Sequence, residues 1–83
     1  MDRSVEELVA AARLHDAEAF TALIRRFEGV ALSIAYAHAR HASDAADLVQ
    51  EAFLRAWQRL DSLDDPGRFG HWLGRMVRNL AID

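Results

Sequence analysis

The chain has few residues with catalytic or ligand-binding chemistry, and the first candidates are two histidines near an aspartate. His38 and His41 are three positions apart, and Asp44 follows three positions later. Imidazole and carboxylate groups are ordinary zinc ligands. The pair falls at an expected helix end, however, and no second cluster of ligands follows it. Two surface histidines are the favoured interpretation, so we expect neither a metal nor a cofactor.

A second candidate is the carboxylate pair Asp47 and Glu51, which are one helical turn apart. Acid–base catalysis needs a carboxyl group whose pKa is shifted by a pocket or by a charged neighbour. No His or Lys partner accompanies this pair, and the chain has no glycine-rich phosphate loop. A solvated face or a docking surface is favoured for the two carboxylates. We therefore expect no catalytic residues and a protein that is not an enzyme.

The C-terminal part of the chain combines basic, apolar and amide side chains. Leu63, Phe69 and Trp72 flank an acidic loop, and residues 68–82 contain three Arg, His71 and no acid. Single-stranded nucleic acid binds where apolar surface accepts bases, arginines hold phosphates and amides read base edges. Alternatively, the aromatic residues belong to the core and the arginines are simply solvated. The residues alone leave both interpretations open.

Composition and charge limit the class of protein. We expect the 83 residues to form one domain, 1–83. The absence of cysteine indicates a reducing compartment. No apolar run approaches the ~20 residues of a membrane span, and no signal peptide is visible. We therefore expect a cytoplasmic domain without membrane insertion. The net charge of −3 comes from residues 1–54, with five Arg and nine acids; residues 55–83 carry five Arg and four Asp. The C-terminal part is the end that favours an anionic partner.

Apolar residues at three-and-four spacing predict four helices and no strands. Ser4 and Glu7 match a capping box for a first helix that ends near His15. Asp16 is expected to cap a second helix that runs to roughly Arg40. The predicted inner stripe of this helix is Phe20, Leu23, Ile24, Phe27, Val30, Ala31, Ile34 and Ala35.

Polar caps also delimit the last two helices. Asp44 is expected to cap the third helix, and Asp65 followed by Pro66 predicts the start of the fourth. Gly29 lies inside the second helix, where we expect it to allow close packing or a slight bend. The predicted fold is all-α, a compact bundle of four helices. The core stripes of the third and fourth helices are Leu48, Val49, Ala52, Phe53, Ala56, Trp57, Leu60 and Phe69, Trp72, Leu73, Met76, Val77, Leu80.

One aliphatic residue, Leu54, falls at the centre of the polar half of the third helix. A single exposed leucine usually has no function. An apolar anchor with a polar rim, however, is the form that a helix-docking site takes. The periodicity is compatible with a docking site and with a plain solvated face. The polar neighbours of Leu54 on this half of the helix are Asp47, Gln50, Glu51 and Gln58.

Two segments in tandem resemble region 2 of bacterial RNA polymerase sigma factors, in particular the extracytoplasmic-function (ECF) group. They are Asp44–Trp57, with the sequence DAADLVQEAFLRAW, and Phe69–Asp83, with the sequence FGHWLGRMVRNLAID. The opening Asp16–Phe20 also fits the start of that region. The resemblance covers nearly the whole chain from about Val5.

The resemblance implies two binding surfaces. The third helix would dock on the clamp helices of the polymerase β′ subunit, and the matching positions are Asp47, Gln50, Glu51 and Leu54, with Gln58 on the rim. The loop and the last helix would recognise the −10 promoter element and hold the melted non-template strand. Positions matching the flipped-base pocket are Ser62, Leu63 and Asn79, and the candidates for phosphate and base contacts are Arg59, Arg68, His71, Arg75 and Arg78. Trp72 matches a family tryptophan that we assign mainly to the core.

Some features depart from the family pattern. Asp61, Asp64 and Asp65 form an acidic cluster in the loop that should bind DNA. The chain also stops before a region 4 helix-turn-helix domain, so we expect a fragment of a longer factor. The leading prediction is a transcription initiation domain. The alternative is a helical interaction module of sigma ancestry, bound by an anti-sigma or regulatory partner, that does not read DNA.

Overall fold

Four α-helices and two short 3₁₀ helices make up residues 2–82, the part of the chain that the computed structural model describes. Asp83, the last residue of the second sigma-like segment, lies outside it. The α-helices are α1 (Val5–Arg13), α2 (Ala17–His38), α3 (Ala42–Gln58) and α4 (Phe69–Ile82). The 3₁₀ helices η1 (Leu60–Ser62) and η2 (Pro66–Arg68) connect α3 to α4. The predicted all-α bundle of four helices is confirmed.

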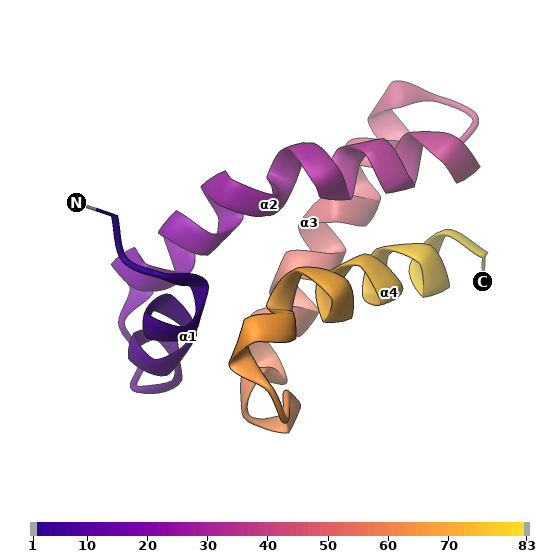
Figure 1. The fold of residues 1–83 in the computed structure, drawn as a ribbon. Coiled ribbons are helices and arrows are strands. Elements are labelled where there is room, and N and C mark those ends of the chain that lie inside the picture. The colour runs from indigo at the N-terminus through magenta and orange to yellow at the C-terminus, as the bar shows by residue number, and fades with distance from the viewer. Residues whose placement is uncertain (1, 83) are drawn as a thin grey trace.

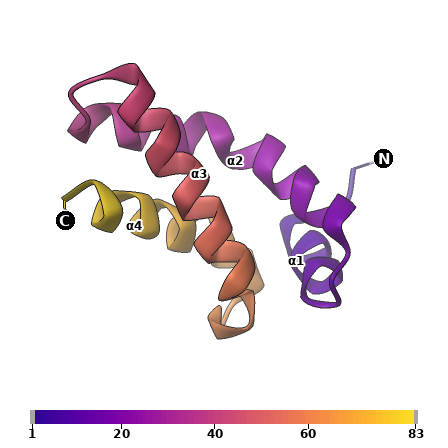
Figure 2. The same ribbon diagram turned by 180° about the vertical axis from the view of Figure 1, so that it is seen from behind.

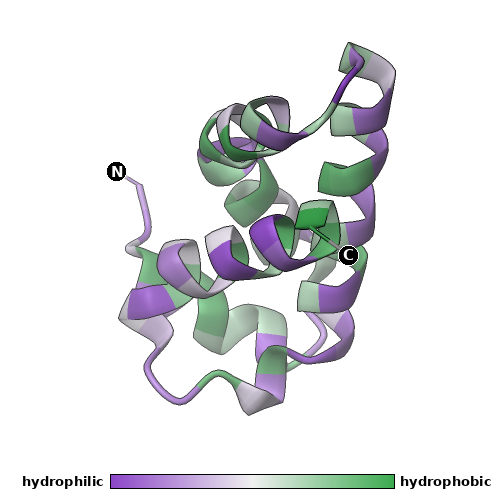
Figure 3. Cartoon of the chain, turned by 90° about the vertical axis from the view of Figure 1, so that its right-hand side faces the viewer, coloured by the Kyte–Doolittle hydropathy of each residue, from purple (hydrophilic) through white to green (hydrophobic). Residues whose placement is uncertain are grey.

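The helices pack in two layers. α3 crosses behind α2 and α4 in Figure 1 and in front of them in Figure 2, and α1 lies at the N-terminal end of α2. The molecule measures 36 × 26 × 18 Å, and its shortest dimension matches two layers of helices about 10 Å across. Each helix carries both hydrophobic and hydrophilic segments in Figure 3, as expected when every helix contributes one face to a shared core.

Three phenylalanines, one from each of the three longest helices, form the centre of the core. The ring of Phe20 on α2 meets those of Phe53 on α3 and Phe69 on α4 edge to face, with both pairs of centroids 6.4 Å apart. Such pairs contribute about 0.5–1.5 kcal/mol each beyond the area they bury. Within residues 2–82 no polar or charged side chain is buried. The core is therefore purely apolar, and every chemically active group lies at its edge.

The caps of the first two helices form as predicted. The Ser4 hydroxyl accepts a hydrogen bond from the Glu7 amide at 3.1 Å, and the Glu7 carboxylate accepts one from the Ser4 amide at 3.0 Å. These bonds, the backbone one first, lower the pKa of the Glu7 carboxyl group. Because the folded pKa is depressed, the stabilisation is present above the unfolded pKa and is lost as the pH falls through the folded one. Asp16 accepts hydrogen bonds from the amides of Glu18 and Ala19.

The predicted cap of α3 is wrong. This helix begins at Ala42, so His41 occupies the N-cap position, without a capping hydrogen bond from its side chain, and Asp44 lies in the first turn. The carboxylate of Asp44 is still favourable there, because the positive end of the helix dipole extends over the whole first turn. The preceding helix ends at His38, two residues before the predicted Arg40.

The contact between α2 and α4 corrects two further predictions. Val30, predicted in the core, is 56% exposed. A Cβ atom added at Gly70 of α4 would lie 2.5 Å from the Phe27 ring, whereas one added at Gly29 would meet nothing within 4 Å. The close packing expected at Gly29 therefore occurs at Gly70. α4 also approaches α2 at Ile34, and Val30, between these two contacts, is left at the rim of a groove.

Candidate protein and nucleic-acid interfaces

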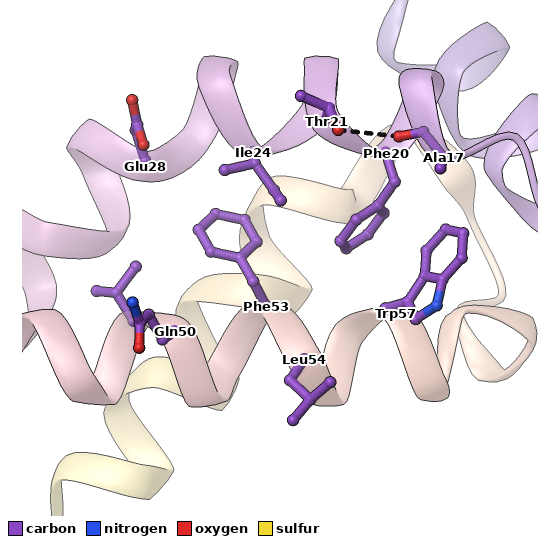
Figure 4. A pocket seen from close by; sticks show the side chains of 10 residues that line it. Ala17, Phe20, Thr21, Ile24, Glu28, Gln50, Phe53, Leu54 and Trp57 are labelled. Carbon is purple, nitrogen blue, oxygen red and sulfur yellow. Dashed lines mark hydrogen bonds between the residues drawn. The ribbon is translucent and has the colours of Figure 1, made fainter.

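The outer face of α3 presents the predicted docking residues to solvent. The side chain of Leu54 is 52% exposed, and its polar neighbours are exposed as well. Figure 4 shows Leu54 pointing away from α2, on the opposite side of α3 from Phe53. The docking face, as we call this surface, consists of Asp47, Gln50, Glu51, Leu54 and Gln58.

One member of the docking face has a charged partner on its own helix. The Arg55 Nε atom lies 3.2 Å from the Glu51 Oε2 atom, and both side chains are nearly half exposed. An exposed pair at this i,i+4 spacing contributes about 0.3–0.5 kcal/mol, so it does not prevent Glu51 from binding another group. Asp47 forms no ion pair with any side chain in residues 2–82. Both carboxylates are therefore accessible to a partner.

An apolar groove between α2 and α3 borders the docking face (Figure 4). It has a volume of about 480 Å³, and its lining includes Gln50 and Leu54 of the docking face. Ile24 and Trp57 also line it, and both side chains are only half-buried. Periodicity assigned these two residues to the core because they lie on the inner halves of their helices. A groove forms where two such stripes diverge, which periodicity does not reveal.

The loop between α3 and α4 borders a second, smaller pocket of about 240 Å³, which we call the loop pocket. Leu63 contributes to this pocket although its side chain is only 5% exposed, so it serves both the core and the pocket wall. The predicted DNA-contact residues are divided by this pocket: Ser62, Leu63, Arg68, His71 and Arg75 line it, whereas Arg59, Arg78 and Asn79 are exposed outside it. Trp72 also lines the pocket and is half-buried against the core.

The acidic loop residues have distinct positions. The Asp65 carboxylate accepts a hydrogen bond from the Gly67 amide at 3.0 Å and thereby caps η2, which leads directly into α4. Pro66 is the first residue of η2, whereas the sequence predicted it as the first residue of the fourth helix, which begins at Phe69. Asp64 and Asp65 both line the loop pocket, and Asp61 lines a separate cavity together with Trp57. One of the three carboxylates therefore has a structural partner at the start of the helix.

A groove between α2 and α4 continues the basic surface. Its volume is about 340 Å³, and it is lined by Val30, Ile34, His71, Arg75 and Arg78 together with Phe27, Gly70 and Gly74. His71 and Arg75 also line the loop pocket, so they stand between the two hollows. Among residues 2–82, no acidic side chain lines this groove. Negatively charged groups should therefore bind more favourably in this groove than in the loop pocket, which contains two carboxylates.

Arg13 is a site residue that the sequence did not indicate. It lies at the C-terminal end of α1, where a basic side chain is common. Its guanidinium group donates one hydrogen bond to the Leu60 carbonyl at 3.4 Å and another to the Leu63 carbonyl. The loop that borders the pocket is therefore attached to a helix almost fifty residues earlier in the chain.

In residues 2–82, no three His, Asp or Glu side chains come together as metal ligands. None of the helices in this range is both long and apolar enough to cross a membrane.

A family model and several similar proteins all point to the same family. The model of sigma-70 region 2 matches residues 23–83. Similar proteins include a probable RNA polymerase sigma factor RfaY of Xanthomonas campestris, 41% identical over 80% of this chain and 16% of that protein. The ECF sigma factor SigW of Bacillus subtilis is 29% identical over the whole chain and 44% of its own length. The ECF sigma-E factor of Escherichia coli is 34% identical over 89% of the chain and 38% of its own length. The chain thus spans less than half the length of each of these relatives. No solved structure matches the chain.

Proposed function

Because the chain belongs to the sigma-70 region 2 family and to its ECF group, we propose that it is a transcription initiation domain with two binding surfaces. The docking face of α3 binds the clamp helices of the polymerase β′ subunit. The loop pocket and the exposed side of α4 recognise the −10 promoter element and hold its melted non-template strand. In this proposal the domain acts by binding alone and catalyses nothing.

The observation that carries the proposal is the exposure of Leu54 at the centre of a polar ring. Leu54 is 52% exposed and is not among the hydrophobic residues of the described chain, 2–82, that form the core or pack against it. Central apolar residues surrounded by polar groups contribute most of the free energy in helix docking. The adjacent α2–α3 groove adds apolar area that a second helix of the partner can cover.

Support for the DNA surface comes from the lining of the loop pocket and from the distribution of charge around it. The loop pocket is a hollow of a size to accept a single base, with Leu63 and Trp72 as apolar wall and Ser62 as a polar group. Arg75 and Arg78 continue along α4 into the groove without carboxylates, where phosphates are favoured. Asp65, one of the three aspartates of the loop, has its carboxylate engaged in capping η2.

A charge reversal on the docking face tests the proposal. Glu51→Arg places two guanidinium groups one turn apart, which costs the fold only a few tenths of a kcal/mol. We expect the variant to remain folded and to lose binding to an isolated β′ clamp-helix fragment in a pull-down. Glu18→Arg makes the same change of charge in the first turn of α2 and serves as the control. Equal capture of wild type and Glu51→Arg would refute docking through this face.

The α2–α3 groove and the carboxylates of the loop pocket favour a second candidate, a module bound by an anti-sigma or regulatory partner without reading DNA. Salt dependence separates the two functions. A DNA reader releases counterions, so the logarithm of its affinity for single-stranded DNA falls linearly with the logarithm of salt concentration. A chain that shows no salt-dependent DNA affinity but is held by an apolar partner would support the second candidate.

A further inference from the structure

We propose that Arg13 is a positioning residue that sets the base selectivity of the loop pocket. This inference rests on the proposed function, because it assumes that the pocket receives a DNA base. Arg13 belongs to α1 and lines a different cavity, so it is not itself a DNA contact in this proposal. It acts through the backbone of the segment that carries Ser62 and Leu63.

The first step of the inference is the geometry of the attachment. Leu60 and Leu63 are the first residue and the C-cap of η1, and their carbonyl oxygens both accept hydrogen bonds from the Arg13 guanidinium group. The short η1 helix otherwise holds its shape through only two backbone hydrogen bonds, from Ser62 to Arg59 at 2.8 Å and from Leu63 to Leu60 at 3.2 Å. A planar guanidinium group that spans both ends of η1 therefore adds as many hydrogen bonds as the helix makes itself.

The second step is the position of the held segment. Ser62 and Leu63, which lie within the span of Arg13, line the loop pocket. The Ser62 hydroxyl already donates a hydrogen bond to the Arg59 carbonyl at 2.7 Å, so its direction also depends on the backbone of η1. The basic pocket residues, Arg68, His71 and Arg75, come from η2 and α4, and the Arg13 hydrogen bonds go to Leu60 and Leu63 instead. Loss of Arg13 should thus alter the pocket wall that meets the base and leave the phosphate-binding arginines in place.

The third step concerns what a loosened wall does to binding. Discrimination between bases needs polar and apolar groups at fixed positions, whereas attraction to phosphates depends mainly on the number of positive charges nearby. Loss of Arg13 should therefore change mainly the ratio of the affinities for two DNA strands of different sequence. The part of the affinity that comes from the phosphates should change less.

The test compares Arg13→Gln, Arg13→Lys and the control Arg26→Gln in the chain of residues 1–83. Arg26 is a suitable control because its guanidinium group also donates to a distant backbone carbonyl, that of Arg3, and neither residue lines the loop pocket. The first readout is amide hydrogen exchange at Ser62 and Leu63 in the free protein, followed by NMR. The second is the affinity ratio between the single-stranded DNA that the wild type selects from a randomised pool and its single-base variants. Thermal melting of each variant confirms that it is folded.

We expect Arg13→Gln to exchange the Ser62 and Leu63 amides about tenfold faster than wild type, since two hydrogen bonds to a charged donor are lost. Its affinity ratio should fall toward one at a single base position, while its affinity for unselected strands stays unchanged. Arg13→Lys retains one donor group and should recover part of both effects, and Arg26→Gln should match the wild type.

The inference would be overturned if the Ser62 and Leu63 amides of Arg13→Gln exchanged at the wild-type rate. An unchanged affinity ratio, or a uniform loss of affinity for all strands, would also overturn it. A wild-type chain that selects no strand from the pool would instead contradict the proposed function. In that case the assignment of selectivity falls with it, and the exchange rates alone decide whether Arg13 holds the loop.

Discussion

Two leucines of this domain have opposite environments, and each suits a different binding task. Leu54 is 52% exposed on α3, and Leu63 is 5% exposed directly after η1. An exposed aliphatic residue on a rigid helix is available to another protein, whereas a buried one gives a pocket a firm wall. The proposed polymerase and DNA surfaces therefore depend on different residues and should respond to different substitutions.

We expect Asn79→Ala to weaken binding to the −10 single strand at one base only. Asn79 is exposed on α4, and a side-chain amide that reads a base edge contributes about 1–3 kcal/mol of discrimination at that position. Arg78→Ala, at the neighbouring position, is the comparison: as a phosphate contact it should weaken all sequences equally and reduce the salt dependence. Fluorescence anisotropy against strands with single-base changes measures both. A uniform loss for Asn79→Ala would assign it to the backbone of the DNA instead.

His15 is expected to carry backbone strain that a glycine relieves. Its φ angle is +68°, and the amides of His15 and Asp16 donate to the carbonyls of Ala12 and Ala11, which is the Schellman arrangement at the end of α1. An L-residue in this conformation costs about 1 kcal/mol relative to glycine.

The comparison of His15→Gly with His15→Ala isolates this strain. Both variants lose the edge contact between His15 and Trp57, whose ring centroids lie 6.5 Å apart. Denaturant unfolding should therefore find His15→Gly more stable than His15→Ala by about 1 kcal/mol. Equal stability of the two variants would show that the turn carries no such strain.

Helices α2 and α4 approach each other through a glycine of α4, and this sets the width of the groove beside them. Gly70→Ala should destabilise the fold by about 1–3 kcal/mol, because its Cβ atom would lie 2.5 Å from the Phe27 ring. That ring is itself packed against Phe69, with centroids 5.3 Å apart, so it has little room to move. Gly29→Ala, at an open position in the middle of α2, should instead stabilise the fold by about 1 kcal/mol. Thermal melting compares the two; a stable Gly70→Ala would contradict the close approach.

The helices themselves follow largely from local signals in the sequence. The capping box at Ser4 and the Asp16 cap depend on residues within a few positions of each other, and both form. The Asp65–Pro66 cap also forms, but it starts η2, and α4 begins three residues later than predicted. The start of α3 did not follow, because the carboxylate of Asp44 is favourable both as a cap and inside the first turn. A local pattern cannot separate two positions that the same electrostatic effect stabilises.

At the scale of the whole molecule, the sequence predicts a surface residue where its exposure depends only on its position around its own helix. The docking face of α3 is such a case, since the angular position of Leu54 on its own helix places it outside. Features that arise between helices were not predictable from periodicity: the exposure of Val30, the α2–α3 groove and the hydrogen bonds of Arg13 to the loop. Each depends on how two elements distant in sequence diverge or meet.

The most direct test of the docking proposal is the affinity of the Leu54→Asp variant for an isolated β′ clamp-helix fragment, measured by titration. Val30→Asp is the matched control, because Val30 is exposed to a similar extent, 56% against 52%, but lies on α2 beside α4. If Leu54 is the central contact, Leu54→Asp should lose about 2 kcal/mol or more of binding free energy, roughly thirtyfold in affinity, with an unchanged melting temperature. Val30→Asp should bind like the wild type. Wild-type affinity in a folded Leu54→Asp variant would contradict the proposal that this face docks on the polymerase.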